Sequence, residues 1–347
     1  MSVFDNAAFE QHERVVYCND PQSGLRAIIA IHSTALGPAA GGCRFWHYED
    51  NASALTDVLR LSRGMSYKNA MAGLSLGGGK AVIMAPENRQ LTDDVLAAFG
   101  RFVDTLHGDY ITAEDVGMSV AAMQTVASET RFVAGLPSDE GQAGGDPSPK
   151  TADGVFHGIR AAVRHQTGSD ALAGMHVAVQ GVGNVGLSLC RTLAAAGAKL
   201  TVADINEARV RMVCEELSAT PSSLEDIVAT DADVFSPCAL GAILNESSIP
   251  TLKARIVAGA ANNQLATDDD GQRLFDAGVI YAPDYVINAG GIINVGCEYA
   301  GGVSNAEVDQ RVEQIGERLD TIFEQSASEK RPTNEIADQL ARERIGR

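Results

Sequence analysis

The sequence has no long apolar segment and no cysteine motif, and each absence removes a class of protein. No run approaches the ~20 consecutive apolar residues that cross a bilayer. The first residues, MSVFDNAAFEQHERVV, lack the basic region and apolar core of a secretory leader, so we expect a cytoplasmic protein. The six cysteines include no CxxC pair, which argues against a disulfide framework and a zinc site. We therefore expect no metal.

Positive charge is also scarce. The chain has 27 Lys and Arg residues against 45 Asp and Glu residues, giving a formal net charge of −18. A chain this acidic repels nucleic acid and anionic membranes, so we expect neither as a partner. We expect a small molecule as the partner instead. Its 347 residues, 45% of them hydrophobic, are typical of a globular protein with two domains.

Strand and helix patterns alternate along the chain, which is typical of an α/β protein. The first half begins with a predicted hairpin at 14–32 and continues with alternating helices and strands. A Gly- and Pro-rich connection at 135–150, which we expect to be ordered, precedes a second alternating series. Its strands, which predict a doubly wound parallel sheet, are expected at 175–180, 198–204, 232–237, 255–260, 279–281 and 285–287.

We accordingly predict two domains separated by a cleft. The first is an N-terminal α/β domain for substrate binding and oligomerisation, formed by residues 1–135 plus 328–347. It is discontinuous because the last predicted helix, 333–344, is expected to pack back on it. The second, at 136–327, is a Rossmann-type doubly wound domain of the kind that binds dinucleotides.

The segment GVGNVG, residues 181–186, has the G-x-G-x-x-G pattern of dinucleotide-binding turns. It follows an apolar strand and opens a helix, so Gly181 permits the tight turn, Gly183 admits the pyrophosphate and Gly186 lets the helix pack on the strand. The helix N-terminus, with Asn184 and Val185, offers free N–H groups to the phosphates.

A second strand after this turn ends in Asp204, whose carboxylate would accept hydrogen bonds from the adenosine ribose and repel a 2′-phosphate. The next residues, Ile205 and Asn206, add no positive charge. The pattern therefore favours NAD over NADP as the cofactor.

The segment GLSLGGGKAVI, residues 73–83, presents Lys80 after three glycines. It is not a phosphate-binding P-loop, because position 74 is Leu, position 81 is Ala, and the glycines precede the strand. Lys68 and Lys80 both lie among small apolar residues, where burial lowers the pKa of a lysine and makes it a usable base. Asp115, expected at the end of a neighbouring strand, would complete a proton relay. We expect the glycines to leave room for the substrate.

Together these segments resemble the glutamate/leucine/phenylalanine/valine dehydrogenase family, most closely leucine and phenylalanine dehydrogenases. The resemblance covers nearly the whole chain and includes LGPAAGGCRFW (36–46), GMSYKNAMAGLSLGGGKAVI (64–83), YITAEDVG (110–117), GDPSPKTADGV (145–155), VQGVGNVG (179–186), FSPCALGAILN (235–245), VAGAANNQL (257–265) and YAPDYVINAGGIINV (281–295).

The resemblance implies NAD-dependent oxidative deamination of an L-amino acid to the 2-oxo acid and ammonia. It makes Lys80 the general base, with Asp115 as its proton partner. It assigns the substrate carboxylate to Lys68, Gly41, Gly42 and Asn262. It implies that the nicotinamide side is lined by Thr151, Cys238, Ala239, Ala260 and Asn288.

Side-chain specificity in the family depends on a few positions that correspond here to Ala40, Met65, Ala113, Ile292 and Val295. All are apolar, so a glutamate side chain would find no charged partner. Ala113 resembles leucine dehydrogenases, whereas the small Ala40 would admit an aromatic ring. We favour leucine, valine or isoleucine, and phenylalanine or tryptophan is the alternative substrate.

Assembly and two other functional classes complete the expectations. Leucine dehydrogenases tend to continue past the counterpart of IADQLARERIGR with a tail that supports higher assembly, so we favour a homodimer through the N-terminal domain. An NAD-binding sensor could dispense with Lys80 or Asp115, but both are present. A hydroxy-acid dehydrogenase usually relies on His and Arg, and the seven histidines match no such motif.

Overall fold

The computed structural model describes residues 2–137, 141–239 and 241–347. The chain divides into two compact units. Unit 1 consists of Met1–Gly145, Val295–Asn305 and Ala341–Arg347, and unit 2 consists of Asp146–Asn294 and Ala306–Leu340. The functional domain boundaries at 135/136 and 327/328 remain a prediction. Part of the expected connection, residues 138–140, and Leu240 of the FSPCALGAILN segment lie outside the described residues.

Unit 1 contains a mixed five-stranded sheet in the order β1-β2-β4-β3-β5. Strands β1 and β2 form the predicted antiparallel hairpin, β2 pairs with β4 antiparallel, and β3 runs parallel to β4 and β5. The elements are β1 (Arg14–Asp20), β2 (Leu25–Ser33), β3 (Ala39–Trp46), α1 (Asn51–Met71), β4 (Gly77–Met84), α2 (Asp93–Asp104), β5 (Tyr110–Glu114) and α3 (Val120–Ala127).

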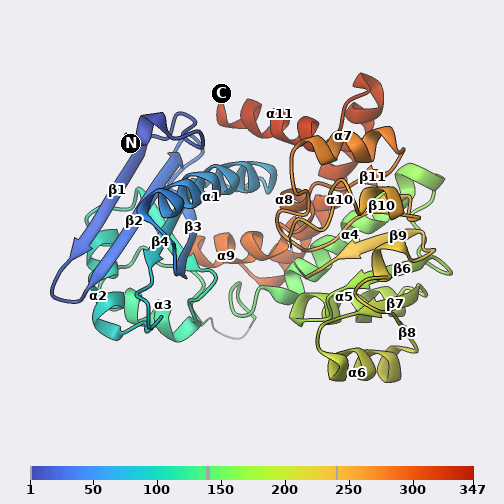
Figure 1. Ribbon diagram of the computed structural model, residues 1–347, viewed down its shortest axis with the longest axis horizontal. Coiled ribbons are helices and arrows are strands. Elements are labelled where there is room, and N and C mark those ends of the chain that lie inside the picture. Colours follow the sequence, from blue (N-terminus) through green and yellow to red (C-terminus); the bar gives the residue numbers. More distant parts are fainter. Residues whose placement is uncertain (1, 138–140, 240) are drawn as a thin grey trace. The chain divides into compact units, whose positions relative to one another are not determined.

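Helices cover both faces of this sheet (Figure 1). On one face, apolar residues of α1 such as Val58 and Leu59 pack against Ile28 and Val82. On the other face, α2 and α3 pack against the alternate residues of the same strands. Helix α1 starts where the Asp50 carboxylate accepts a hydrogen bond from the Ser53 N–H, which satisfies an otherwise unpaired donor.

Unit 2 contains a parallel sheet in the order β11-β10-β9-β6-β7-β8. Numbered from β6, this is the doubly wound order 3-2-1-4-5-6 read from the opposite edge, which confirms the predicted fold class. The elements are α4 (Ser148–Thr167), β6 (His176–Gln180), α5 (Asn184–Ala195), β7 (Lys199–Ala203), α6 (Glu207–Leu217), β8 (Thr220–Pro221), β9 (Val234–Pro237), β10 (Ile256–Val257), α7 (Asp269–Asp276), β11 (Ile280–Tyr281), α8 (Asp284–Ile287), α9 (Gly290–Ala300), α10 (Asn305–Glu329) and α11 (Thr333–Ile345).

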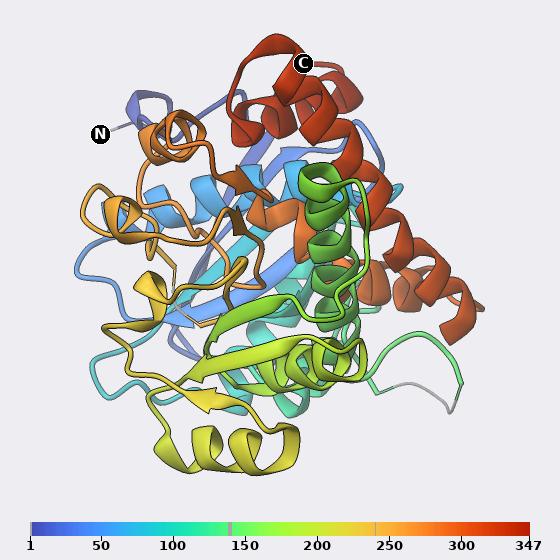
Figure 2. The same cartoon turned by 90° about the vertical axis from the view of Figure 1, so that its right-hand side faces the viewer.

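Helices α4 and α10 lie side by side in unit 2 (Figure 2). Gly158 of α4 makes this approach possible, because a Cβ there would meet the side chains of Ile287 and Leu319. An ion pair between Arg164 and Asp320 joins the same two helices. Helices α9 and α11 each contribute residues to both units.

Three local predictions were wrong or incomplete. Residues 285–287, expected as a strand, belong to helix α8, because the apolar run Tyr285–Ile287 is too short to separate strand from helix. Strand β3 was not predicted, since its Gly-rich sequence, AAGGCRFW, hides the usual strand pattern. Helix α9 was also missed.

Within the described residues, no helix combines the length and the apolar character that a membrane span requires.

Candidate active site

The candidate catalytic pair belongs to the unit 1 sheet and the residue that follows its last strand. Lys80 is on β4 and Asp115 directly follows β5, and the Lys80 Nζ lies 3.0 Å from Asp115 Oδ2. The strands were expected to be neighbours, but β3 lies between them. Gly42 of β3 permits the contact, because a Cβ there would come within 2.8 Å of the Asp115 Cβ.

Burial and charge set the protonation of this pair. Lys80 is only 5% exposed, and its burial lowers its pKa. The Asp115 carboxylate opposes this shift, whereas the positive charge of Arg44 lowers the pKa of Lys80 further. Burial would raise the pKa of Asp115, but the positive charges of Lys80 and Arg44 outweigh it and the net shift is downward. Lys80 is thus closer to neutrality than an exposed lysine, and Asp115 remains ionised.

Arg44 is a residue of this site that the sequence analysis missed. Its Nε donates to Asp115 Oδ2 at 3.0 Å, and its NH1 donates to Asp57 Oδ2 at 3.0 Å. The Tyr48 hydroxyl donates to the same Asp57 oxygen at 2.7 Å. The signal was present in the GGCRFW segment, where an arginine follows the second glycine by two residues on a strand and so shares its face.

The three glycines before Lys80 have a different purpose from the one predicted. A Cβ on Gly78 would lie 2.0 Å from the Ser66 backbone nitrogen on α1, and one on Gly79 would meet the Tyr110 ring at 2.7 Å. A Cβ on Gly77 would lie 2.0 Å from the Ser33 carbonyl oxygen. Protein atoms therefore occupy the space expected for substrate, and the glycines let α1 and the neighbouring strands approach β4.

The other predicted substrate residues of unit 1 gather around the same strands. Ala40 and Gly41 lie on β3, and the Tyr110 hydroxyl donates to the Gly41 carbonyl at 2.7 Å. Met65 on α1 packs over Gly41, where a Cβ would come within 2.9 Å of the Met65 Cγ. Ala113 on β5 pairs with Gly42. Lys68 lies half-buried on the last turns of α1.

In the GVGNVG turn of unit 2, Gly181 and Gly186 have the tight local geometry that was predicted for them. Gly181 has a φ of +94°, which favours glycine, and a Cβ there would meet Ala239 at 2.7 Å. A Cβ on Gly186 would lie 2.0 Å from the Gly181 carbonyl oxygen. Gly183 faces open space apart from Arg209, whose NH1 lies 3.8 Å from the position of a Cβ. Asn184 and Val185 begin α5.

Asp204 follows β7 and supports this turn. Its Oδ2 accepts a hydrogen bond from the Val182 N–H at 2.7 Å, and its Oδ1 accepts one from the Asn206 N–H at 2.8 Å. Ile205 is 88% exposed. Arg209 is the positive charge near the turn that the sequence analysis missed, since it lies three residues beyond the segment that was considered.

A second group of predicted residues lies near the carboxyl ends of the unit 2 strands. The Asn288 Nδ2 donates to the Ala260 carbonyl at 3.1 Å and to Asn262 Oδ1 at 2.8 Å. The buried Asn288 Oδ1 has no hydrogen-bond partner among the described residues, so it is an acceptor that a polar ligand could satisfy. Cys238 and Ala239 directly follow β9.

The remaining predicted residues lie on two helices. Thr151 is in the first turn of α4, where its hydroxyl donates to the Pro147 carbonyl at 2.9 Å. Ile292 and Val295 lie on α9, where Ile292 belongs to unit 2 and Val295 to unit 1.

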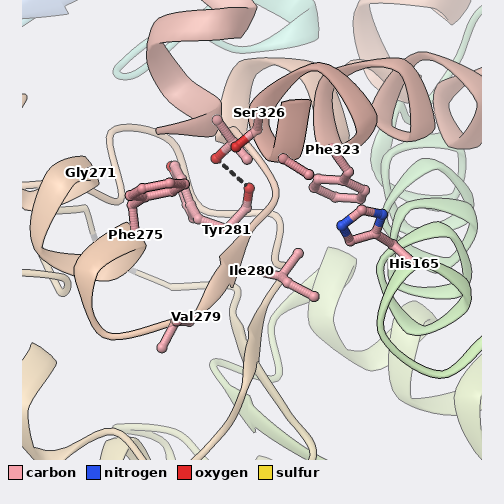
Figure 3. A pocket seen from close by; sticks show the side chains of 11 residues that line it. His165, Gly271, Phe275, Val279, Ile280, Tyr281, Phe323 and Ser326 are labelled. Atoms are coloured by element: carbon pink, nitrogen blue, oxygen red, sulfur yellow. Dashed lines mark hydrogen bonds between the residues drawn. The ribbon is translucent and has the colours of Figure 1, made fainter. Parts of the chain in front are cut away.

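A pocket of about 180 Å³ in unit 2 is separate from these residues (Figure 3). Its wall includes His165, Phe275 and Phe323, and the Thr333 hydroxyl beside it donates to the Tyr281 carbonyl at 2.7 Å. None of the predicted site residues lines this pocket. The Lys80–Asp115 pair of unit 1 and the GVGNVG turn of unit 2 are therefore both distinct from this pocket.

Comparison with known proteins identifies the class. A profile described as "Glu/Leu/Phe/Val dehydrogenase, dimerisation domain" matches residues 12–132, and one described as "Glutamate/Leucine/Phenylalanine/Valine dehydrogenase" matches residues 201–345. The chain therefore belongs to the glutamate/leucine/phenylalanine/valine dehydrogenase family. It is an amino-acid dehydrogenase, an oxidoreductase that acts on CH–NH2 donors, as the sequence predicted.

Individual relatives place the chain in the part of the family that acts on leucine, valine or tryptophan. It is 48% identical to a leucine dehydrogenase of Geobacillus stearothermophilus over 99% of this chain and 94% of the relative. It is 46% identical to a valine dehydrogenase of Streptomyces virginiae over 96% and 94% of the two chains. The crystal structure of L-tryptophan dehydrogenase from Nostoc punctiforme superposes with a TM-score of 0.87 and 44% identity, covering 97% of this chain and 96% of that one.

Proposed function

We propose that the protein catalyses the reversible, NAD-dependent oxidative deamination of an apolar L-amino acid, with leucine, valine and isoleucine as the preferred substrates. The observation that carries this proposal is the buried Lys80, held 3.0 Å from Asp115, in a chain of the amino-acid dehydrogenase family. A lysine with a lowered pKa is suited to take a proton from water near neutral pH.

The proposed chemistry assigns a task to each side chain. Lys68 pairs with the substrate carboxylate and keeps the Cα in register. Bound NAD⁺ would supply the acceptor for the Cα hydride, which leaves an iminium on the substrate. Neutral Lys80 then takes a proton from the water that adds to this iminium, and Asp115 balances the resulting charge. Lys80 returns this proton to the amino nitrogen and accepts the proton of the added hydroxyl as the C–N bond breaks, so that ammonia leaves and the 2-oxo acid forms. The substrate reacts as the free amine, having given its ammonium proton to solvent.

The residues of unit 2 fit a dinucleotide. Gly183 is open where a pyrophosphate would approach, and Arg209 beside it would add a positive charge. The unsatisfied Asn288 Oδ1 would accept a hydrogen bond from the nicotinamide amide. The Asp204 carboxylate supports NAD over NADP, because it would repel a phosphate on the ribose 2′ position.

The proposed preference for an aliphatic substrate is based on the apolar residues assigned to the substrate side-chain pocket and on the names of the relatives. The positions assigned to the side-chain pocket, Ala40, Met65, Ala113, Ile292 and Val295, carry no charge, which disfavours glutamate. Relatives named leucine and valine dehydrogenase support the aliphatic choice. A relative named L-tryptophan dehydrogenase, 45% identical, and the small Ala40 support the alternative of phenylalanine or tryptophan.

The test is NAD⁺ reduction with a panel of L-amino acids at alkaline pH, with NADP⁺ measured in parallel. Higher kcat/KM for leucine and valine than for phenylalanine and tryptophan is the expected result. A preference for an aromatic substrate would replace the aliphatic assignment, and faster reduction of NADP⁺ would contradict the role of Asp204.

We also propose a homodimer formed through the N-terminal domain. The profile that matches residues 12–132 describes a dimerisation domain, and β1 is an edge strand that pairs with β2 alone among the described residues. Light scattering coupled to size exclusion measures the mass directly. A monomer or an octamer at micromolar concentration would contradict the proposal.

A further inference from the structure

Arg44 connects the catalytic pair to a second carboxylate through a continuous chain of polar contacts. Lys80 Nζ and Arg44 Nε approach the same oxygen of Asp115, each at 3.0 Å. The other side of the Arg44 guanidinium donates to Asp57 on α1, and Tyr48 donates to Asp57 in turn. The contacts join β3, β4, α1 and the residue after β5.

We propose that Arg44 is a positioning residue of the dehydrogenase: it orients the Asp115 carboxylate toward Lys80, and Asp57 with Tyr48 fixes the orientation of Arg44. This inference rests on the proposed role of Lys80 as the base. Arg44 acts through Asp115 and is assigned no contact with the substrate.

The geometry explains why an arginine is required. A planar guanidinium binds two acceptors in fixed directions, so the contact with Asp57 determines where the Nε–H points. That N–H then donates to Asp115 Oδ2, the same carboxylate oxygen that faces Lys80. A lysine at position 44 would keep the charge but lose the fixed fork.

The charges of this cluster balance only when Arg44 is present. Lys80 and Arg44 are two cations, and Asp115 and Asp57 are two anions. Without Arg44, the cluster would contain two carboxylates and only one cation, Lys80. The protonated form of Lys80 would then be stabilised. The positive charge of Arg44 lowers the pKa of Lys80, which agrees in direction with this reasoning.

The other titratable groups near the pair do not supply charge at neutral pH. Cys43 on β3 and Tyr110 on β5 are buried, and burial raises the pKa of each. Burial and the contact with Asp57 also raise the pKa of Tyr48, and burial raises that of Cys18 on β1. The cluster of Lys80, Asp115, Arg44 and Asp57 therefore dominates the electrostatics of the pair.

A structural ion pair would also explain the contacts, and the pH profile separates the two roles. If Arg44 only joined α1 to β3, its loss would lower thermal stability and leave the pH dependence of kcat/KM unchanged. If it positions Asp115 and lowers the pKa of Lys80, its loss moves the rising limb of the profile to higher pH, because Lys80 acts in its neutral form.

The experiment compares Arg44→Ala, Arg44→Gln and Arg44→Lys in the full chain. For each variant, kcat and kcat/KM are measured with the best substrate of the amino-acid panel across the alkaline range, together with the thermal midpoint. Arg101→Ala on α2, which removes an exposed ion pair with Glu129, is the control and should leave the pH profile unchanged.

We expect Arg44→Ala to lose roughly ten- to a hundredfold in kcat, the order of loss when reacting groups are misplaced, with its rising limb at higher pH. Arg44→Gln should show the same shift in the limb with a smaller loss of kcat, because the amide still donates to Asp115. Arg44→Lys should restore the position of the limb but only part of kcat.

Two outcomes separate the failures. If Lys80→Ala abolishes turnover and Arg44→Ala keeps the wild-type limb and kcat at temperatures where it is folded, the Arg44 proposal is wrong and the role of Lys80 stands. If Lys80→Ala retains normal turnover, the proposed function of Lys80 is wrong, whatever the Arg44 variants do.

Discussion

The candidate site uses side chains in unit 1 and backbone in unit 2. In unit 1, four charged side chains from β3, β4, α1 and the residue after β5 form a chain of contacts at hydrogen-bond distance. In unit 2, the features that fit a cofactor are a turn with glycines at close approach, a helix N-terminus and a carboxylate that accepts two backbone hydrogen bonds. The first arrangement depends on long-range contacts, whereas the turn and the helix N-terminus of the second are consecutive residues and only Asp204 is contributed by the next strand.

This difference decides how each part responds to substitution. A charged network loses chemistry when one member is removed, even if the fold survives, because the remaining charges are left unbalanced. A turn built on glycines loses binding or stability when a side chain is added, since the added atoms collide with backbone. Single substitutions in each unit therefore test the contrast, beginning with the largest expected effect.

The largest effect is expected for Lys80→Ala. Removal of the base should reduce kcat by at least about a thousandfold, within the range of general base catalysis. Binding of NADH, measured by its fluorescence, should be retained, because the residues proposed to bind the cofactor belong to unit 2. Lys253→Ala, at an exposed lysine of unit 2, is the control and should leave turnover unchanged. Near-normal turnover of the Lys80→Ala variant would contradict the proposed role of Lys80 as the general base.

Gly78→Ala should cause the next largest effect, and in stability. The added Cβ would lie 2.0 Å from the Ser66 nitrogen and 2.1 Å from the Ser66 Oγ, so α1 must move away from β4. We expect the free energy of unfolding to fall by about 3 kcal/mol, the upper range for overpacking a core. Denaturant unfolding measures this directly.

Gly64→Ala on the same helix is the matched control for Gly78→Ala. An added Cβ at position 64 would have nothing within 4 Å, and the backbone there is ordinary helix, so alanine should stabilise the helix by about 0.5–1 kcal/mol. If Gly78→Ala were as stable as the wild type, the glycines before Lys80 would be free for another purpose, including the predicted one of admitting substrate.

The same contrast explains how much of the site could be predicted from sequence. The GVGNVG turn was predicted residue by residue, because its strand, turn and helix are contiguous and each glycine has a local reason. The fold class followed from the alternation of strands and helices in unit 2, apart from α8. The resemblance to a known family supplied Lys80 and Asp115 as partners, and their 3.0 Å contact agrees with it.

The partners of Arg44 and the packing of the glycines could not be predicted in this way, although the GGCRFW segment places Arg44 on the face of Gly42. Arg44 lies 71 residues from Asp115 in the chain, and β3, which brings them together, was not recognised. Gly78 is packed against α1, twelve residues earlier at Ser66, in an approach that only the three-dimensional arrangement reveals. Long-range contacts of this kind leave no periodic pattern in the sequence.

Ala40→Leu should change substrate preference within unit 1. Ala40 is 6% exposed and belongs to β3 beside the catalytic pair, so added methyl groups would reduce the space for a ring. We expect the ratio of kcat/KM for leucine over phenylalanine to rise roughly 10- to 200-fold, which corresponds to about 1–3 kcal/mol, as for other apolar pockets. Ala40→Gly should move the ratio in the opposite direction. An unchanged ratio in both variants would exclude Ala40 from the pocket.

The smallest effect is expected for Asp204→Ala in unit 2. The variant loses an acceptor for the ribose and for the Val182 and Asn206 N–H groups, but the glycines and the helix N-terminus remain. We expect the Kd for NADH to rise about tenfold, close to the contribution of one hydrogen bond to a charged group, with less discrimination against NADPH. Fluorescence titration with both cofactors measures this. A loss of binding as complete as the loss of turnover in Lys80→Ala would mean that unit 2, like unit 1, depends on a single charged side chain, and the contrast between the two units would fail.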